Sequence, residues 1–144
     1  MRVIFVDFDG VLHATHGRGA IMREYVWLPI LMELISGYSD VRVVVHASAR
    51  RNTSPDFLNG RLRIPARTWM GVTPANLERW PSIQAWLESR PDVEAFLILD
   101  DQLSEFPTPP PAELIVCDPK KGLSEPHVQA AVIAWLAATD QMPH

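Results

Sequence analysis

The sequence begins with a buried-strand pattern that ends in two acidic residues, and this stretch constrains the fold more than any other. Val3–Val6 is an unbroken run of β-branched and aromatic side chains, which indicates a strand buried on both faces. Asp7 and Asp9 follow directly, and in an extended segment they point to the same side. Gly10 allows a tight turn just beyond them. Because two such carboxylates repel each other, the stretch predicts a cation or an unusual proton arrangement at the strand end.

Strand and helix patterns alternate through the rest of the sequence. Three further apolar runs predict buried strands, at Val41–Val45, Val93–Leu99 and Glu113–Cys117. Apolar residues at helical spacing predict three helices, at about Glu24–Ser36, Asn76–Ser89 and Ser124–Thr139. The tail beyond the last helix is expected to fray.

Proline and glycine interrupt the remaining segments. In residues 52–80 they leave only a short helix, at about Pro55–Leu62, as an expected element. Residues 13–24 are polar and contain two glycines, so they predict a loop over the end of the first strand. Four prolines in Phe106–Pro111 predict an extended surface connection.

Alternating strands and helices predict parallel β-α units with right-handed crossovers, and hence a three-layer α/β/α sandwich with a Rossmann-like parallel sheet. A length of 144 residues suits one domain over residues 1–144. In such sheets ligands bind outside the carboxyl ends of the strands. Polar residues follow four of the predicted strands, namely Asp7 and Asp9, Ser48 and Arg50, Asp100 and Asp101, and Asp118 and Lys120. This distribution favours a site at that edge of the sheet.

The composition narrows the class of protein. Hydrophobic residues make up 47% of the chain, charged residues 21%, and the formal net charge is −4, which indicates a soluble globular domain. The mildly acidic balance argues against nonspecific binding to a phosphate backbone. A local cluster of arginines could still attract an anionic substrate: Arg50, Arg51, Arg61, Arg63 and Arg67.

Several classes are disfavoured by what the sequence lacks. Cys117 is the only cysteine, which excludes an intramolecular disulfide and a cysteine-rich zinc site, and predicts a cytoplasmic protein. The sequence shows no cleavable signal pattern and no apolar run long enough to span a bilayer, so we expect neither secretion nor a membrane partner. No G-x-G-x-x-G motif follows a strand, which disfavours a dinucleotide-binding domain.

The octet F-V-D-F-D-G-V-L resembles the first motif of the haloacid dehalogenase-like (HAD) superfamily of phosphohydrolases, and F-L-I-L-D-D resembles its fourth. The resemblance implies that Asp7 attacks phosphorus and forms an aspartyl-phosphate, and that Asp9 acts first as acid and then as base. It also implies a Mg²⁺ cofactor held by Asp7, the Asp9 carbonyl and an acid after the third strand. Asp101 is the favoured ligand there, with Asp100 beside it to orient water or a cation, although the sequence alone could reverse the pair. Gly10 is assigned to substrate binding.

The second motif departs from the family pattern. V-V-V-H-A-S-A-R resembles the H-S-S-W-R strand end of small HAD proteins, with Ala47 and Ala49 in place of a hydroxyl and a tryptophan. Ser48 is therefore assigned to the phosphate, Arg50 to an anionic group of the substrate, and His46 to a structural role.

The third motif of the family supplies a cation, and three residues of this chain compete for that role. Lys120, in D-P-K-K-G-L-S, is chosen as the catalytic residue. Lys121 and Arg79 remain its rivals.

The resemblance leaves no room for a large cap domain, and an open cleft suits a macromolecular or bulky substrate, or a lid from a partner subunit. G-V-T-P and G-L-S are similar to features of a small capless HAD group associated with RNA-repair proteins. The leading hypothesis is a magnesium-dependent phosphomonoesterase, active on nucleotides or nucleic-acid ends, as a monomer or homodimer. The alternatives are a HAD-fold binding or regulatory module with little turnover, and a transferase that passes phosphate to an acceptor other than water.

Overall fold

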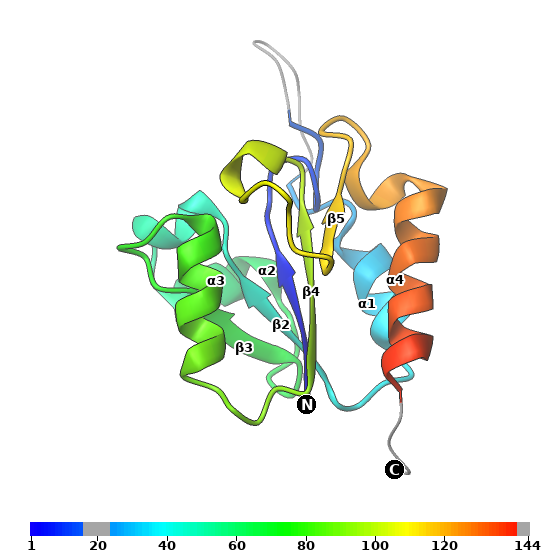
Figure 1. Ribbon diagram of the computed structural model, residues 1–144, viewed down its shortest axis with the longest axis horizontal. Helices are drawn as coiled ribbons and strands as arrows, with labels where there is room; N and C mark the ends of the chain where they lie inside the picture. Colours follow the sequence, from blue (N-terminus) through cyan, green and yellow to red (C-terminus); the bar gives the residue numbers. More distant parts are fainter. Residues whose placement is uncertain (16–23, 141–144) are drawn as a thin grey trace.

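The computed structural model describes residues 1–15 and 24–140 (Figure 1). The strands in these ranges are β1 (Arg2–Val6), β2 (Val41–Val45), β3 (Trp69–Val72), β4 (Ala95–Asp100) and β5 (Leu114–Val116). The α-helices are α1 (Leu28–Ile35), α2 (Pro55–Leu62), α3 (Arg79–Glu88) and α4 (Pro126–Thr139). Short 3₁₀ helices are η1 (Ser48–Arg51), η2 (Leu103–Glu105) and η3 (Gly122–Ser124). None of the helices described here has the length and apolar character needed to cross a bilayer.

The strands form one parallel sheet in the order β3-β2-β1-β4-β5. β1 lies at the centre and pairs along its whole length with β2 and β4, so that Ile4 lies opposite both Val43 and Leu97. Helices cover both faces, which is why every residue of β1 is buried and its sequence is almost unbroken in apolar character. The predicted three-layer α/β/α sandwich with a Rossmann-like sheet is confirmed, and the described residues contain no large cap domain.

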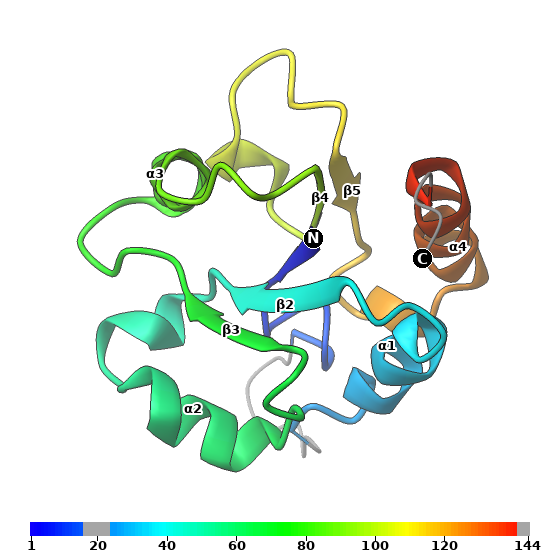
Figure 2. The same cartoon turned by 90° about the horizontal axis from the view of Figure 1, so that it is seen from below.

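The side chains of β1 alternate between two cores. Ile4 and Val6 belong to a large core shared with α1, α2 and α4, whereas Val3 and Phe5 belong to a smaller core shared with α3. Phe5 packs edge-on against Trp86 of α3, with ring centres 5.5 Å apart. Figure 2 shows the layers, with α3 on one side of the sheet and α1 and α4 on the other.

β3 is the one strand of the described sheet that the sequence pattern does not predict. All four of its residues are only partly buried, so it lacks the apolar run of the central strands. It also contains Gly71 at a φ of 103°, and its pairing with β2 is irregular between Val43 and Val45. A short edge strand with a glycine gives a weak sequence signal.

Two helices begin later than their apolar spacing predicts. α1 begins at Leu28 and α3 at Arg79, and each has a proline in its first turn, Pro29 and Pro81. A proline is tolerated in the first turn because the missing N–H has no helical partner there, but it restricts the residues before it. The predicted helix at Pro55–Leu62 is present with those bounds.

The predicted connections are partly described. Residues 106–111 contain neither helix nor strand, as expected, although Phe106 is buried in the smaller core. Residues 16–23 of the predicted 13–24 loop, and residues 141–144 of the predicted fraying tail, lie outside the described residues.

The strand order places the ends of β1 and β4 side by side. The chain leaves β1 towards β2 and β3, then crosses back through α3 to add β4 on the other side of β1. The carboxyl ends of strands at such a reversal form the usual ligand site of open α/β sheets. Asp7 follows β1 and Asp100 ends β4, so the topology itself brings these acids together.

We predict that Gly122→Ala destabilises the fold. Gly122 has a φ of 44°, and a Cβ there would lie 2.6 Å from the Val11 carbonyl oxygen and 2.7 Å from the Trp27 ring. We expect the free energy of unfolding in urea to fall by about 2 kcal/mol or more. Gly37→Ala is the matched control, since a Cβ at Gly37 meets nothing within 4 Å. Equal stability of the two variants would contradict the packing described here.

Candidate active site

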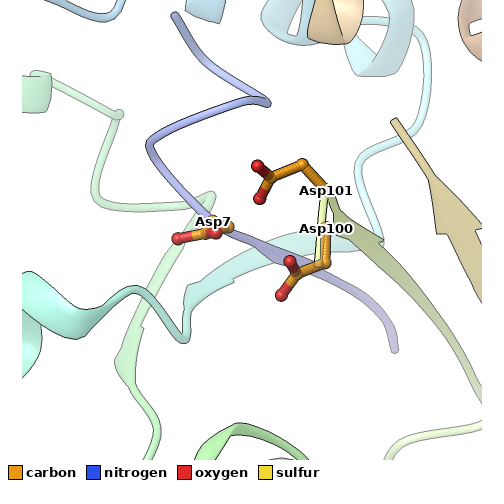
Figure 3. A group of neighbouring side chains, drawn as sticks. All are labelled: Asp7, Asp100 and Asp101. Atoms are coloured by element: carbon orange, nitrogen blue, oxygen red, sulfur yellow. The ribbon is translucent and has the colours of Figure 1, made fainter. Parts of the chain in front are cut away.

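Three carboxylates converge at the carboxyl ends of β1 and β4 (Figure 3). Asp7, Asp100 and Asp101 each offer an oxygen atom, and these atoms lie within 4.8 Å of one another. At that separation two full charges repel by about 3 kcal/mol even with an effective dielectric of about 20. Three ionised carboxylates therefore need positive charge or protons to remain together.

Arg79 supplies the positive charge from the first residue of α3. Its Nη1 atom donates to Asp7 Oδ2 at 2.9 Å and to the Asp100 oxygens at 2.9 and 3.0 Å. Its side chain is only 10% exposed, so solvent screens these contacts little. Among the three cations that the sequence leaves open, Arg79 is the one in contact with the acids.

Asp100 uses both of its oxygens within the protein. Oδ2 receives a hydrogen bond from His46 Nε2 at 2.8 Å, and Oδ1 accepts from the Gln102 backbone N–H at 2.8 Å, in addition to the contacts with Arg79. Burial lowers the pKa of His46, which favours the neutral ring with the proton on Nε2. Asp100 is thus the acid that holds Arg79 in place.

Asp101 is less fully satisfied. Its Oδ2 receives a weak hydrogen bond of 3.4 Å from Thr15 Oγ1, whereas its buried Oδ1 has no partner among the described residues. Gly10 packs directly on this carboxylate: with a φ of 80°, a Cβ at Gly10 would lie 2.4 Å from Asp101 Cγ. Oxygen ligands are what Mg²⁺ prefers, so an unpartnered carboxylate oxygen beside Asp7 fits a metal site.

The electrostatics of the acids differ because their partners differ. Burial raises the pKa of Asp7 to about 7, the charge of Asp100 adds to the rise, and Arg79 opposes it. Burial likewise raises the pKa of Asp101 to about 6, with Asp7 and Asp100 adding to it. Burial also favours the neutral form of Asp100, but the hydrogen bond from His46 and the charge of Arg79 outweigh it and lower the pKa of Asp100. Asp7 and Asp101 thus lack enough positive charge nearby, whereas Asp100 has it. A bound cation would reduce the repulsion between these carboxylates.

A cleft of about 350 Å³ opens over Asp7. It is lined by Asp7, Phe8, Asp9, His13, Glu24, Tyr25, Ala47, Ser48, Ala49 and Arg79. Asp9 is 66% exposed, and its Oδ1 contacts His13 Nε2 at 2.7 Å. Ser48 is exposed in the same cleft, at the start of η1. The structure therefore places Asp7, Asp9 and Ser48, three of the predicted site residues, in one cleft.

Two predicted site residues, Arg50 and Lys120, do not line the cleft. Arg50 is 3% exposed, and its guanidinium donates to backbone carbonyls of His46, Ala47, Pro74 and Leu77. It fixes the loop after β2, so its donors are not free for a substrate.

Lys120 is the second of these residues. Its side chain is exposed, it does not line the cleft, and its backbone N–H donates to Asp118 Oδ1 at 2.8 Å in a surface turn. Position after a strand is not enough to bring a lysine to the acids, because β5 lies at the edge of the sheet.

Sequence reasoning missed His13 and Tyr25. The four-residue spacing from Asp9 to His13 is visible in the sequence, but only the turn at Gly10, whose N–H donates to the His13 carbonyl at 2.8 Å, brings the two side chains together. Tyr25 reaches the site because the chain returns to the cleft before α1, with the Tyr25 N–H on His13 Nδ1 at 3.1 Å.

The sheet order, the paired aspartates after β1 and the acids that end β4 define an α/β protein of the haloacid dehalogenase-like superfamily. The particular family follows from a family model described as "HAD domain in Swiss Army Knife RNA repair proteins", which matches residues 3–128. The chain belongs to this family. Searches of curated proteins and of solved structures found no match. The family supports hydrolase activity of the HAD type in general terms.

We predict that the metal-free protein loses stability as the pH rises. The pKa of Asp7 is raised in the folded state from 3.8 to about 7, so the folded protein holds a proton that the unfolded chain releases. The free energy of unfolding therefore falls as the pH rises from about 4 to about 7, and the difference between wild type and Asp7→Asn should fall by on the order of 4 kcal/mol. Urea unfolding with a chelator across the window measures this difference. Parallel pH profiles of the two proteins would contradict the charge crowding.

Proposed function

We propose that this chain is a magnesium-dependent phosphohydrolase that cleaves phosphate monoesters through a covalent aspartyl-phosphate on Asp7. The observation that carries the proposal is the placement of Asp7: buried, in contact with Arg79, beside the acids of β4 and open to a cleft that also contains Asp9. Membership in a HAD family supports the same class of chemistry.

The residues present fit a divalent cation. Asp7, Asp101 and the Asp9 carbonyl would hold Mg²⁺, with the unpartnered Oδ1 of Asp101 as the clearest vacant ligand atom among the described residues. Asp100 is close enough to join them, but its oxygens already serve Arg79 and His46. When bound, Mg²⁺ supplies positive charge that lets a phosphate dianion approach the acids.

Asp7 acts as the nucleophile in this scheme. One of its carboxylate oxygens forms a bond to phosphorus as the bond from phosphorus to the leaving oxygen breaks. Asp9 gives that leaving oxygen a proton. In the second step Asp9 takes a proton from water, the water oxygen bonds to phosphorus, and the bond from phosphorus to Asp7 breaks to release inorganic phosphate.

Arg79 and Ser48 would bind the phosphoryl group. In the described part of the chain, Arg79 Nε and Nη2 have no hydrogen-bond partner, while Nη1 is occupied by Asp7 and Asp100. The guanidinium can therefore remain hydrogen-bonded to Asp7 and Asp100 and still donate to phosphate oxygens. The Ser48 hydroxyl is exposed on the same cleft.

We further propose a nucleotide or a nucleic-acid end as the substrate. No large cap among the described residues covers the cleft, so a bulky phosphate ester such as a nucleic-acid end can reach it. The description of the family, a domain of RNA repair proteins, supports the same choice.

The proposal predicts turnover of an aryl phosphate that needs both Mg²⁺ and Asp7. We expect inorganic phosphate release by wild type, loss of about 1,000-fold or more in Asp7→Asn, and loss on chelation that Mg²⁺ restores. Asp56→Asn, an exposed aspartate in the first turn of α2, is the control and should keep full activity. A folded wild type without Mg²⁺-dependent turnover would instead support the binding-module hypothesis.

A second prediction separates Arg79 from Lys120. Arg79→Gln removes the positive charge that contacts Asp7 and the guanidinium donors proposed to bind the phosphoryl group. We therefore expect kcat/KM to fall about 100-fold or more. Lys120→Gln should stay within about threefold of wild type because its side chain is on the surface. Circular dichroism of both variants checks that they are folded. The reverse order of effects would restore Lys120 to the site.

A further inference from the structure

Asp9 has the least protein around it of the acids in the site. Its side chain is 66% exposed, and in the described part of the chain the one side-chain contact that restrains it is that of His13 Nε2 with Oδ1, at 2.7 Å. A carboxylate at this exposure can otherwise adopt several rotamers, and a general acid must be within reach of the proton acceptor. What holds Asp9 therefore bears directly on its chemistry.

The protein itself determines which nitrogen of His13 carries the proton. The backbone N–H of Tyr25 donates to His13 Nδ1 at 3.1 Å, so Nδ1 must present a lone pair. The ring proton then lies on Nε2, which donates to Asp9 Oδ1. Since Oδ1 is an acceptor in this bond, the proton that Asp9 transfers must be carried by Oδ2.

Tyr25 is held firmly enough to impose this tautomer. Its backbone lies in the left-handed region, with a φ of 57°, which is costly for a side chain of this size. The Tyr25 ring packs against the Phe8 ring, with ring centres 5.0 Å apart. The guanidinium of Arg61, a residue of α2, lies 5.7 Å from the centre of the Tyr25 ring. His13 is itself only 6% exposed. These contacts hold Tyr25 beside His13, where its backbone N–H meets Nδ1.

We propose that His13 is a positioning residue, which holds Asp9 in one rotamer with Oδ2 as its proton-carrying oxygen, and that Tyr25 fixes the tautomer that this requires. The inference rests on the proposed function, because it gives Asp9 the acid–base role. It adds two residues to that function, the buried His13 and the backbone N–H of Tyr25, neither of which belongs to β1 or β4.

The kinetic test uses two substrates and a double-mutant cycle. Phenyl phosphate needs a proton on its leaving oxygen far more than p-nitrophenyl phosphate does, and kcat/KM reports the step that forms the aspartyl-phosphate. His13→Phe keeps a ring against Tyr25 but has no N–H. We expect kcat/KM to fall about tenfold or more for phenyl phosphate and less than about threefold for p-nitrophenyl phosphate.

The cycle asks whether the loss passes through Asp9. With phenyl phosphate, His13→Phe should cost nothing further, within about twofold, in an Asp9→Asn background. His127→Phe, an exposed histidine outside the cleft, is the matched control and should leave both substrates unaffected. Equal losses on both substrates, or losses that multiply in the double variant, would overturn the positioning role and leave the phosphohydrolase intact. An inactive wild type would overturn the phosphohydrolase, and the role of His13 with it.

A second measurement does not depend on turnover or on the folding of a variant. Nitrogen NMR of wild type at about pH 8, where an ordinary histidine is neutral, reports the tautomer of each ring. We expect His13 to carry its proton on Nε2 with an unprotonated Nδ1. A proton on Nδ1, or rapid averaging of the two tautomers, would overturn the proposal.

Discussion

The contact between Arg79 and the carboxylates of Asp7 and Asp100 is the interaction on which the site depends. Burial and the charge of Asp100 raise the pKa of Asp7 to about 7, and the positive charge of the Arg79 guanidinium opposes this rise. Asp100, held by His46 and the Gln102 N–H, keeps Arg79 in place. Since one guanidinium cannot offset three carboxylates, the protein leaves a deficit of positive charge at the place where a metal and a phosphate would meet.

The sequence predicts the centre of this fold well and its edges poorly. The apolar run before Asp7 identifies β1 because a strand covered on both faces admits few polar residues. The same reasoning fails for β3, which is half-buried at the sheet edge and contains Gly71. It also sets helix starts too early, because apolar spacing continues through the residues that precede Pro29 and Pro81.

The site follows the same division. Asp7, Asp9, Asp100 and Asp101 could be predicted because they directly follow or end central strands, whose neighbours are set by topology. Arg79 could only be one of three choices, since its contact with Asp7 crosses 72 positions and depends on how α3 packs. Arg50 illustrates the converse: an arginine after a strand suggests an anion, yet its donors close a backbone turn instead. Local sequence reports which groups are present, and tertiary packing decides which way their donors point.

The two faces of the sheet are covered by cores of different size. The larger core joins α1, α2 and α4, whereas the smaller core rests on α3 and on Phe106 from the segment after β4. Arg79 begins α3, and the helix is seated by Ile83 and by Trp86 against Phe5. If heat or a mutation remote from the cleft loosened the packing of α3 on the smaller core, Arg79 would move away from Asp7. The strands and the acids at their ends would stay in place. The reactivity proposed for Asp7 is thereby tied to the smaller of the two cores, and activity should decline on warming before the sheet itself unfolds.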